Sequence, residues 1–114
     1  MAESKLRELS TDFAVKVIKL CNCIKGHYSL VNQPERSATS IGANIREAQY
    51  AHGKADFIAK LQIALKEANE TGYWLELLYK TNYINESNYQ ALDAACTSIR
   101  VMLISSINTA KENP

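Results

Sequence analysis

The stretch that decides the fold reads Arg36-Ser-Ala-Thr-Ser-Ile-Gly-Ala-Asn-Ile-Arg-Glu-Ala-Gln-Tyr50. Ile41 and Ile45 are four residues apart, so they share one face of an α-helix. Bulky side chains are missing around them, and small residues stand where a helix meets its neighbours. These small residues are Ser37, Ala38, Ser40, Gly42, Ala43 and Ala48. The stretch predicts a helix that other helices approach closely.

Apolar residues recur at three- and four-residue steps on both sides of this stretch, which is typical of amphipathic helices. The pattern predicts helices over about 4–25, 34–51, 54–82 and 85–111. Connections of about three to eight residues favour antiparallel neighbours. The prediction is an all-α protein, an up-down-up-down antiparallel four-helix bundle, with residues 1–114 forming a single domain.

Four residues mark the expected helix ends and contacts. Pro34 is expected near a helix start, where its missing N–H is not needed. Gly53 marks a break, and Asn85 followed by an acid is a good helix cap. Gly72 lies inside the third helix, where glycine costs about 1 kcal/mol relative to alanine, so close packing is the expected reason for it.

The composition excludes several classes of protein. The net charge is +1, and 46% of the residues are apolar. The longest apolar run covers only residues 101–104, far short of a membrane span. Three cysteines without a secretory leader indicate reduced thiols. We therefore expect a cytoplasmic protein with no membrane partner, no cofactor and no small-molecule substrate.

Apolar residues outnumber the positions on the helices' inner faces. Ile63, Trp74 and Leu77 fall away from the core stripe of the third helix, and Met102 lies beside that of the fourth. A helix that is apolar nearly all round is buried on more than one side. The pattern predicts a homo-oligomer with these four residues in its interface; the alternative is ordinary single exposed apolar residues.

Polar residues near the core have structural and functional interpretations. Asn44 is expected to be a hydrogen-bonded amide at the core edge, with a ligand contact as the alternative. Glu67 and Glu70 are three residues apart, as in metal-binding bundles, but no Glu-x-x-His motif accompanies them. We expect them to be ion-pair partners for Arg36, Arg46 or a lysine of a neighbouring subunit, and we expect no metal or catalytic site.

Basic residues on the first three helices are the candidates for nucleic-acid contact. They are Lys16, Lys19, Arg36, Arg46 and Lys54. Repetition in an oligomer would sum their modest charges. The alternative is a solvated face, because acidic residues are interleaved with them.

The sequence resembles a known family. The second helix carries Arg36-Ser-Ala, Ser40-Ile, Ala43-Asn-Ile and Glu47, and the third carries Phe57, Leu61, Ile63-Ala-Leu-Lys-Glu-Ala-Asn-Glu-Thr71 and Trp74. These phrases are similar to those of the four-helix-bundle proteins encoded in intervening sequences of bacterial 23S ribosomal RNA genes. The likeness extends over nearly the whole chain.

The resemblance implies a ring-like homopentamer of up-and-down bundles. The accessory protein of diversity-generating retroelements is a related member, a basic pentamer that binds nucleic acid and a reverse transcriptase. The present chain departs from it in lacking a strong basic excess. We predict a non-enzymatic homo-oligomeric scaffold or adaptor that associates with RNA or an RNA-handling protein; the alternative is a protein-protein interaction module with no nucleic-acid role.

Overall fold

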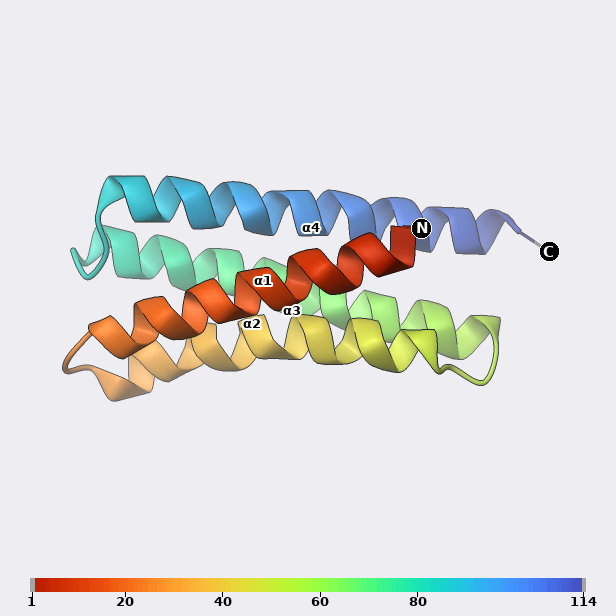
Figure 1. The fold of residues 1–114 in the computed structure, drawn as a ribbon, viewed down its shortest axis with the longest axis horizontal. Coiled ribbons are helices and arrows are strands. Elements are labelled where there is room, and N and C mark those ends of the chain that lie inside the picture. The colour runs from red at the N-terminus through yellow and green to blue at the C-terminus, as the bar shows by residue number, and fades with distance from the viewer. Residues whose placement is uncertain (1, 114) are drawn as a thin grey trace.

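Four helices make up the fold in the computed structural model, which describes the backbone of residues 2–113 and the side chains of residues 4–113. They are α1 (Ala2–Cys23), α2 (Tyr28–Gln49), α3 (Lys54–Lys80) and α4 (Glu86–Glu112). Each helix packs against two neighbours: α1 and α3 both contact α2 and α4. Their alternating directions (Figure 1) confirm the predicted antiparallel four-helix bundle, whose Cα atoms extend over 49 × 22 × 19 Å.

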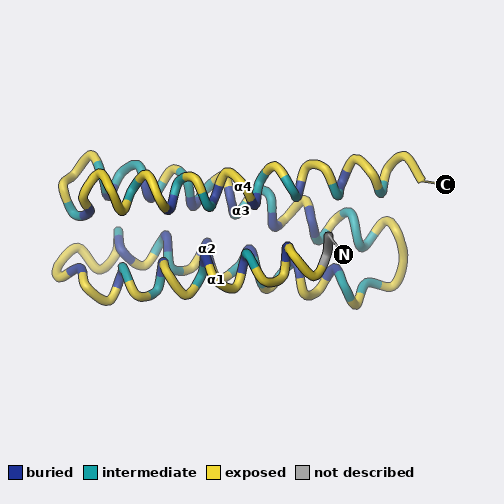
Figure 2. Tube along the Cα trace, turned by 45° about the horizontal axis from the view of Figure 1, so that its top comes forward, coloured by how far each residue is buried: buried dark blue, intermediate teal, exposed yellow. Residues whose placement is uncertain are grey.

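The core occupies the space that the inner faces of all four helices share. Buried segments point towards neighbouring helices and exposed segments face outwards (Figure 2). Burial of each large apolar side chain contributes about 1.5–3 kcal/mol relative to exposure. The largest fully buried apolar side chains include Leu6, Phe13, Val17, Ile41, Ile45, Leu75, Leu78, Ile99 and Leu103.

Small residues of α2 set its distance from α1. Ser37, Ala38 and Ala48 are buried, as the sequence indicated. A Cβ atom added at Gly42 would lie 3.4 Å from Oγ of the fully buried Ser10 on α1. Glycine therefore permits the two backbones to approach closely at this point.

Two expectations about small residues are wrong. Ala43 is exposed, because it lies on the outer side of α2. Gly72 is not explained by close packing, since no heavy atom outside its immediate helix surroundings lies within 4 Å of a Cβ built there. The structure gives no physical account of the glycine at position 72.

The second helix begins at Tyr28, and the predicted start at Pro34 is wrong. Gly26, at φ 86°, and His27, at φ 43°, turn the chain between α1 and α2 in the left-handed region. Pro34 is buried inside α2, where it cannot donate to the carbonyl of Leu30. Burial of the ring on the core side offsets part of that loss.

The predicted cap of the fourth helix is confirmed. Asn85 is extended, and its Oδ1 accepts a hydrogen bond of 2.7 Å from the backbone N–H of Asn88. This bond satisfies one of the free N–H groups at the start of α4.

A pair of hydroxyl groups links α2 and α3 inside the core. Ser37 and Thr71 are both fully buried. Thr71 Oγ1 lies 2.7 Å from Ser37 Oγ and 2.8 Å from the carbonyl oxygen of Glu67, and Ser37 Oγ lies 3.3 Å from the carbonyl oxygen of Pro34. Each hydroxyl thus has partners that offset the cost of burying it.

Replacement of Thr71 by Val should lower the free energy of unfolding by about 1 kcal/mol, because Ser37 loses one of its two partners. Chemical denaturation followed by circular dichroism measures this change. Thr109→Val, at an exposed position of α4, is the matched control and should leave stability nearly unchanged. Equal stability of Thr71→Val and the wild type would contradict a stabilising role for the hydroxyl pair.

Candidate functional site

Apolar side chains emerge on the side of α3 that borders α2. Ile63 is 40% exposed, whereas Trp74 and Leu77 are half-buried and stand outside the core cluster. Polar residues of the same side are interleaved with them. We define the Trp74 flank as the surface formed by Ile63, Glu67, Glu70, Tyr73, Trp74 and Leu77.

The indole of Trp74 is incompletely satisfied. Its Nε1 atom is buried and finds no hydrogen-bond acceptor among the described residues. The indole ring packs against Tyr73, with ring centroids 5.0 Å apart and an interplanar angle of 58°. A buried donor without an acceptor costs about 1–3 kcal/mol, so the packing of the ring holds the indole in place against this cost.

The carboxylates of the flank face Arg36 on α2. Arg36 Nη2 lies 3.6 Å from Glu67 Oε1 and 3.5 Å from Glu70 Oε1. The Glu67 side chain is only 15% exposed, so solvent screens its ion pair with Arg36 less than it screens the pair between Arg36 and Glu70. These ion pairs link the flank to α2. The described residues contain no cluster of three His, Cys, Asp or Glu side chains that could hold a metal ion.

A second surface runs along the outer side of α4, and its exposed residues are uncharged. Val101 is 58% exposed and Ile104 is 45% exposed. Arg100 is the one charged residue between positions 94 and 108, and it is half-buried. We define the α4 outer face as the exposed residues Ala94, Thr97, Ser98, Val101, Ile104, Ser105 and Asn108.

Sequence reasoning placed part of the fourth helix in the interface and chose Met102 to represent it. Met102 is half-buried and packs against the core cluster, so it adds little to the outer surface. The available signal was the run of fifteen residues with a single charge, which differs from an ordinary solvated helix face.

The candidate basic residues do not converge on one surface. Arg36 is directed to α3, whereas Arg46 Nη2 lies 3.4 Å from Thr11 Oγ1 on α1. Lys54 stands at the first residue of α3. Lys16 and Lys19 are exposed on α1 and have no acidic partner within the described part of the chain.

Two further polar candidates serve the bundle itself. Asn44 is half-buried, and its Nδ2 donates a 2.9 Å hydrogen bond to the carbonyl oxygen of Ser40 one turn earlier. Glu47 Oε1 lies 3.6 Å from Lys60 Nζ, which links α2 to α3. Both contacts are made within the chain, and Glu47 and Lys60 also line an open pocket of about 370 Å³ together with Arg46, Tyr50, His52 and Asp56.

The cysteines point in different directions. Cys21 is buried and its Sγ donates to the carbonyl oxygen of Val31 at 3.6 Å, whereas Cys23 is exposed. Burial, with Glu35 as a smaller contributor, raises the pKa of Cys21 to about 11. Burial likewise raises the pKa of Cys96 to about 11. Both buried thiols therefore stay protonated near neutral pH and are poor nucleophiles.

The geometry defines an all-helical bundle protein with two distinguishing outer surfaces, the Trp74 flank and the uncharged α4 outer face. Residues 2–105 match the family described as 23S rRNA-intervening sequence protein. The chain belongs to this family. No functionally curated protein matches it.

A solved structure agrees with the fold and the family. It is the crystal structure of a protein of unknown function from the S23 ribosomal protein family of Bacteroides thetaiotaomicron. That protein is 46% identical, the match covers 95% of the present chain and 99% of the other, and the TM-score is 0.91. None of the described helices is both long and apolar enough to cross a membrane.

Thiol reactivity checks the placement of the cysteines. At pH 8 an aromatic disulfide reagent should label one thiol per native chain, Cys23, because the other two are buried and protonated. Denatured protein should give three labelled thiols, and the variant Cys23→Ser should give none in the native state. Rapid labelling of Cys21 or Cys96 in native protein would contradict their burial.

Proposed function

We propose that the protein is a non-enzymatic homo-oligomeric scaffold or adaptor, with copies joined through the Trp74 flank and the α4 outer face. The observation that carries the proposal is the absence of charged residues from the α4 outer face. Fourteen residues separate its ends, which corresponds to about 21 Å of helix. Solvated helix faces normally carry charges, whereas the cores of protein interfaces are depleted in them.

The chemistry of the two surfaces supports contact between them. The Trp74 flank offers the exposed side chain of Ile63. The α4 outer face offers the exposed side chains of Val101 and Ile104, with uncharged polar residues beside them. Contact would remove these apolar side chains from water.

The two surfaces differ, so a contact between them is heterologous. Heterologous contacts generate closed rings when the rotation between copies closes. The resemblance to pentameric bundle proteins supports a ring of five copies. A two-fold dimer would instead require one of the two surfaces to pair with itself.

Ile104→Lys and Trp74→Ala should each lower the sedimentation coefficient at micromolar protein concentration while helicity is retained. Ile104→Lys buries a charge in the interface, and Trp74→Ala removes its largest aromatic contact. Analytical ultracentrifugation with circular dichroism measures both effects. Tyr28→Ala, at an exposed position beside the α1–α2 turn, is the matched control and should leave assembly intact. A wild type that sediments only as a monomer would overturn the proposal.

Association with RNA is the second candidate function. Lys16 and Lys19 are exposed, and a ring would repeat them once per copy. The family description names a 23S rRNA-intervening sequence, which makes ribosomal RNA the first RNA to test. A protein-protein module without a nucleic-acid role is the alternative, favoured by the ion pairs that occupy Arg36.

Binding of a structured 23S rRNA fragment should weaken steeply between about 50 and 200 mM salt, because released counterions drive phosphate contacts. The double variant Lys16→Gln/Lys19→Gln should reduce both the affinity and the salt slope. Lys80→Gln, which removes one lysine that is paired with Glu76 on α3, is the single-charge control. Filter binding over a salt series measures these effects, and salt-independent or absent binding would favour the protein-protein module.

A further inference from the structure

One end of the bundle contains an open notch that the assembly surfaces do not use. One end of the bundle is formed by the last turns of α4 and by the α2–α3 turn, and the first turn of α1 does not extend as far as this end (Figure 1). The notch has a volume of about 780 Å³. Its described lining residues are Ser4, Arg7, Ala48, Gln49, Ala51, Gly53, Lys54, Phe57, Ala110 and Asn113.

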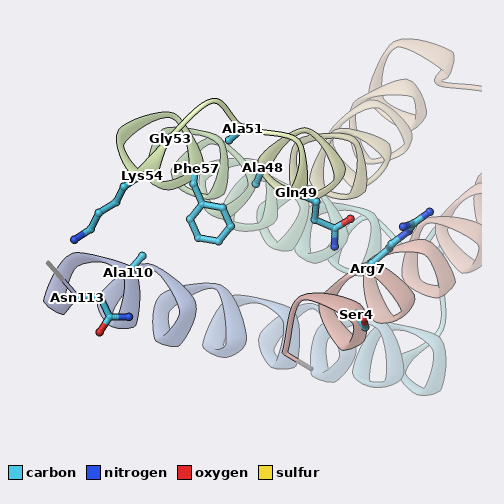
Figure 3. Close-up of a pocket in the computed structure, with 10 residues that line it drawn as sticks. All are labelled: Ser4, Arg7, Ala48, Gln49, Ala51, Gly53, Lys54, Phe57, Ala110 and Asn113. Atoms are coloured by element: carbon cyan, nitrogen blue, oxygen red, sulfur yellow. The ribbon is translucent and has the colours of Figure 1, made fainter.

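The floor of the notch is apolar and its rim is basic. Phe57 and three alanines form the apolar part, and the small alanine side chains leave the space unfilled. In the view of Figure 3 the Phe57 ring lies between the side chains of Lys54 and Arg7, whose charged ends are directed away from the ring. None of the described lining residues is acidic, and neither cation has an ion pair within the described part of the chain.

We infer that this notch binds a small amphipathic organic anion, with an apolar chain or ring against Phe57 and a carboxylate directed to Lys54 or Arg7. The volume lies within the range of about 300–1,000 Å³ typical of small-molecule sites. An apolar floor with two cations and no described acid complements a ligand that is apolar in its body and negative at its head.

A neutral apolar ligand would fit this chemistry less well. It would lie beside two cations without offering them an acceptor, whereas a carboxylate satisfies several of their N–H groups. A polyanion such as RNA would leave the apolar floor uncovered. The sequence indicated no substrate, and the anion proposed here is held without being chemically changed.

The probe is 8-anilinonaphthalene-1-sulfonate, an amphipathic anion whose fluorescence rises in apolar surroundings, titrated into the assembled wild-type protein. Decanoate should displace the probe, and uncharged decanol should compete at least tenfold more weakly. At least one of the variants Lys54→Gln and Arg7→Gln should weaken decanoate binding about tenfold and leave decanol competition unchanged, since loss of one charged hydrogen bond costs about 1.4 kcal/mol. Lys66→Gln, at an exposed position of α3, is the charge-matched control.

Ala110→Phe should abolish probe binding by filling the notch, whereas Ala59→Phe, at an exposed position of α3, adds the same bulk elsewhere and should have no effect. Trp74→Ala separates this site from assembly, because it should change sedimentation and leave decanoate binding intact. Decanoate binding that is absent, or equal in the wild type, Lys54→Gln and Arg7→Gln, would overturn the inference. If Trp74→Ala abolishes probe binding and Ala110→Phe does not, the probe binds to the assembly surfaces, and this result would overturn the inference as well.

Discussion

The close approach of α2 to both of its neighbours is the constraint on which the rest of the structure depends. Gly42 lets Ser10 of α1 come within van der Waals contact, and the hydroxyl pair of Ser37 and Thr71 joins α2 to α3 where larger apolar residues would hold them apart. Protein interiors are packed as densely as organic crystals, so a bulky residue at these points would displace a whole helix. Small residues of α2 therefore set its distances from both α1 and α3.

This spacing determines which side chains remain outside. Once the inner faces are filled, the core has no room for Ile63, Val101 or Ile104, and each keeps at least 40% of its accessible surface. Trp74 is covered halfway, with its N–H buried but unsatisfied. Association stabilises exposed apolar area of this kind by removing it from water.

The sequence predicted the class of fold because the period of Ile41, Ile45 and their counterparts is visible in one dimension. It failed where a residue has opposite meanings in different contexts. Proline is common at helix starts, yet Pro34 lies inside α2, where its ring is buried. Gly72 was attributed to packing, although the space beside it is open. Local preference does not fix the position of Pro34, because its burial depends on the neighbouring helices.

The candidate site was predicted less completely, for a related reason. Periodicity places Trp74 off the core stripe. The sequence also named Arg36 among the possible partners of Glu67 and Glu70, but periodicity alone does not choose it over Arg46. The α4 outer face is recognised by its lack of charged residues. This lack is informative only when the structure shows that the residues are exposed. Sequence patterns record which residues are apolar more readily than which charges are already paired.

The square arrangement of the helices relates the proposed assembly to the proposed RNA contact. α1 is diagonal to α3 and makes no close backbone approach to it, so a contact through the Trp74 flank and the α4 outer face leaves the outer side of α1 uncovered. Lys16 and Lys19 would then face outwards in every copy of a ring. A chain of net charge +1 gains little attraction for RNA alone, but several copies that present the same two lysines along one surface act together. Under this arrangement the apolar faces supply the assembly, and any affinity for a polyanion follows from the repetition that assembly produces.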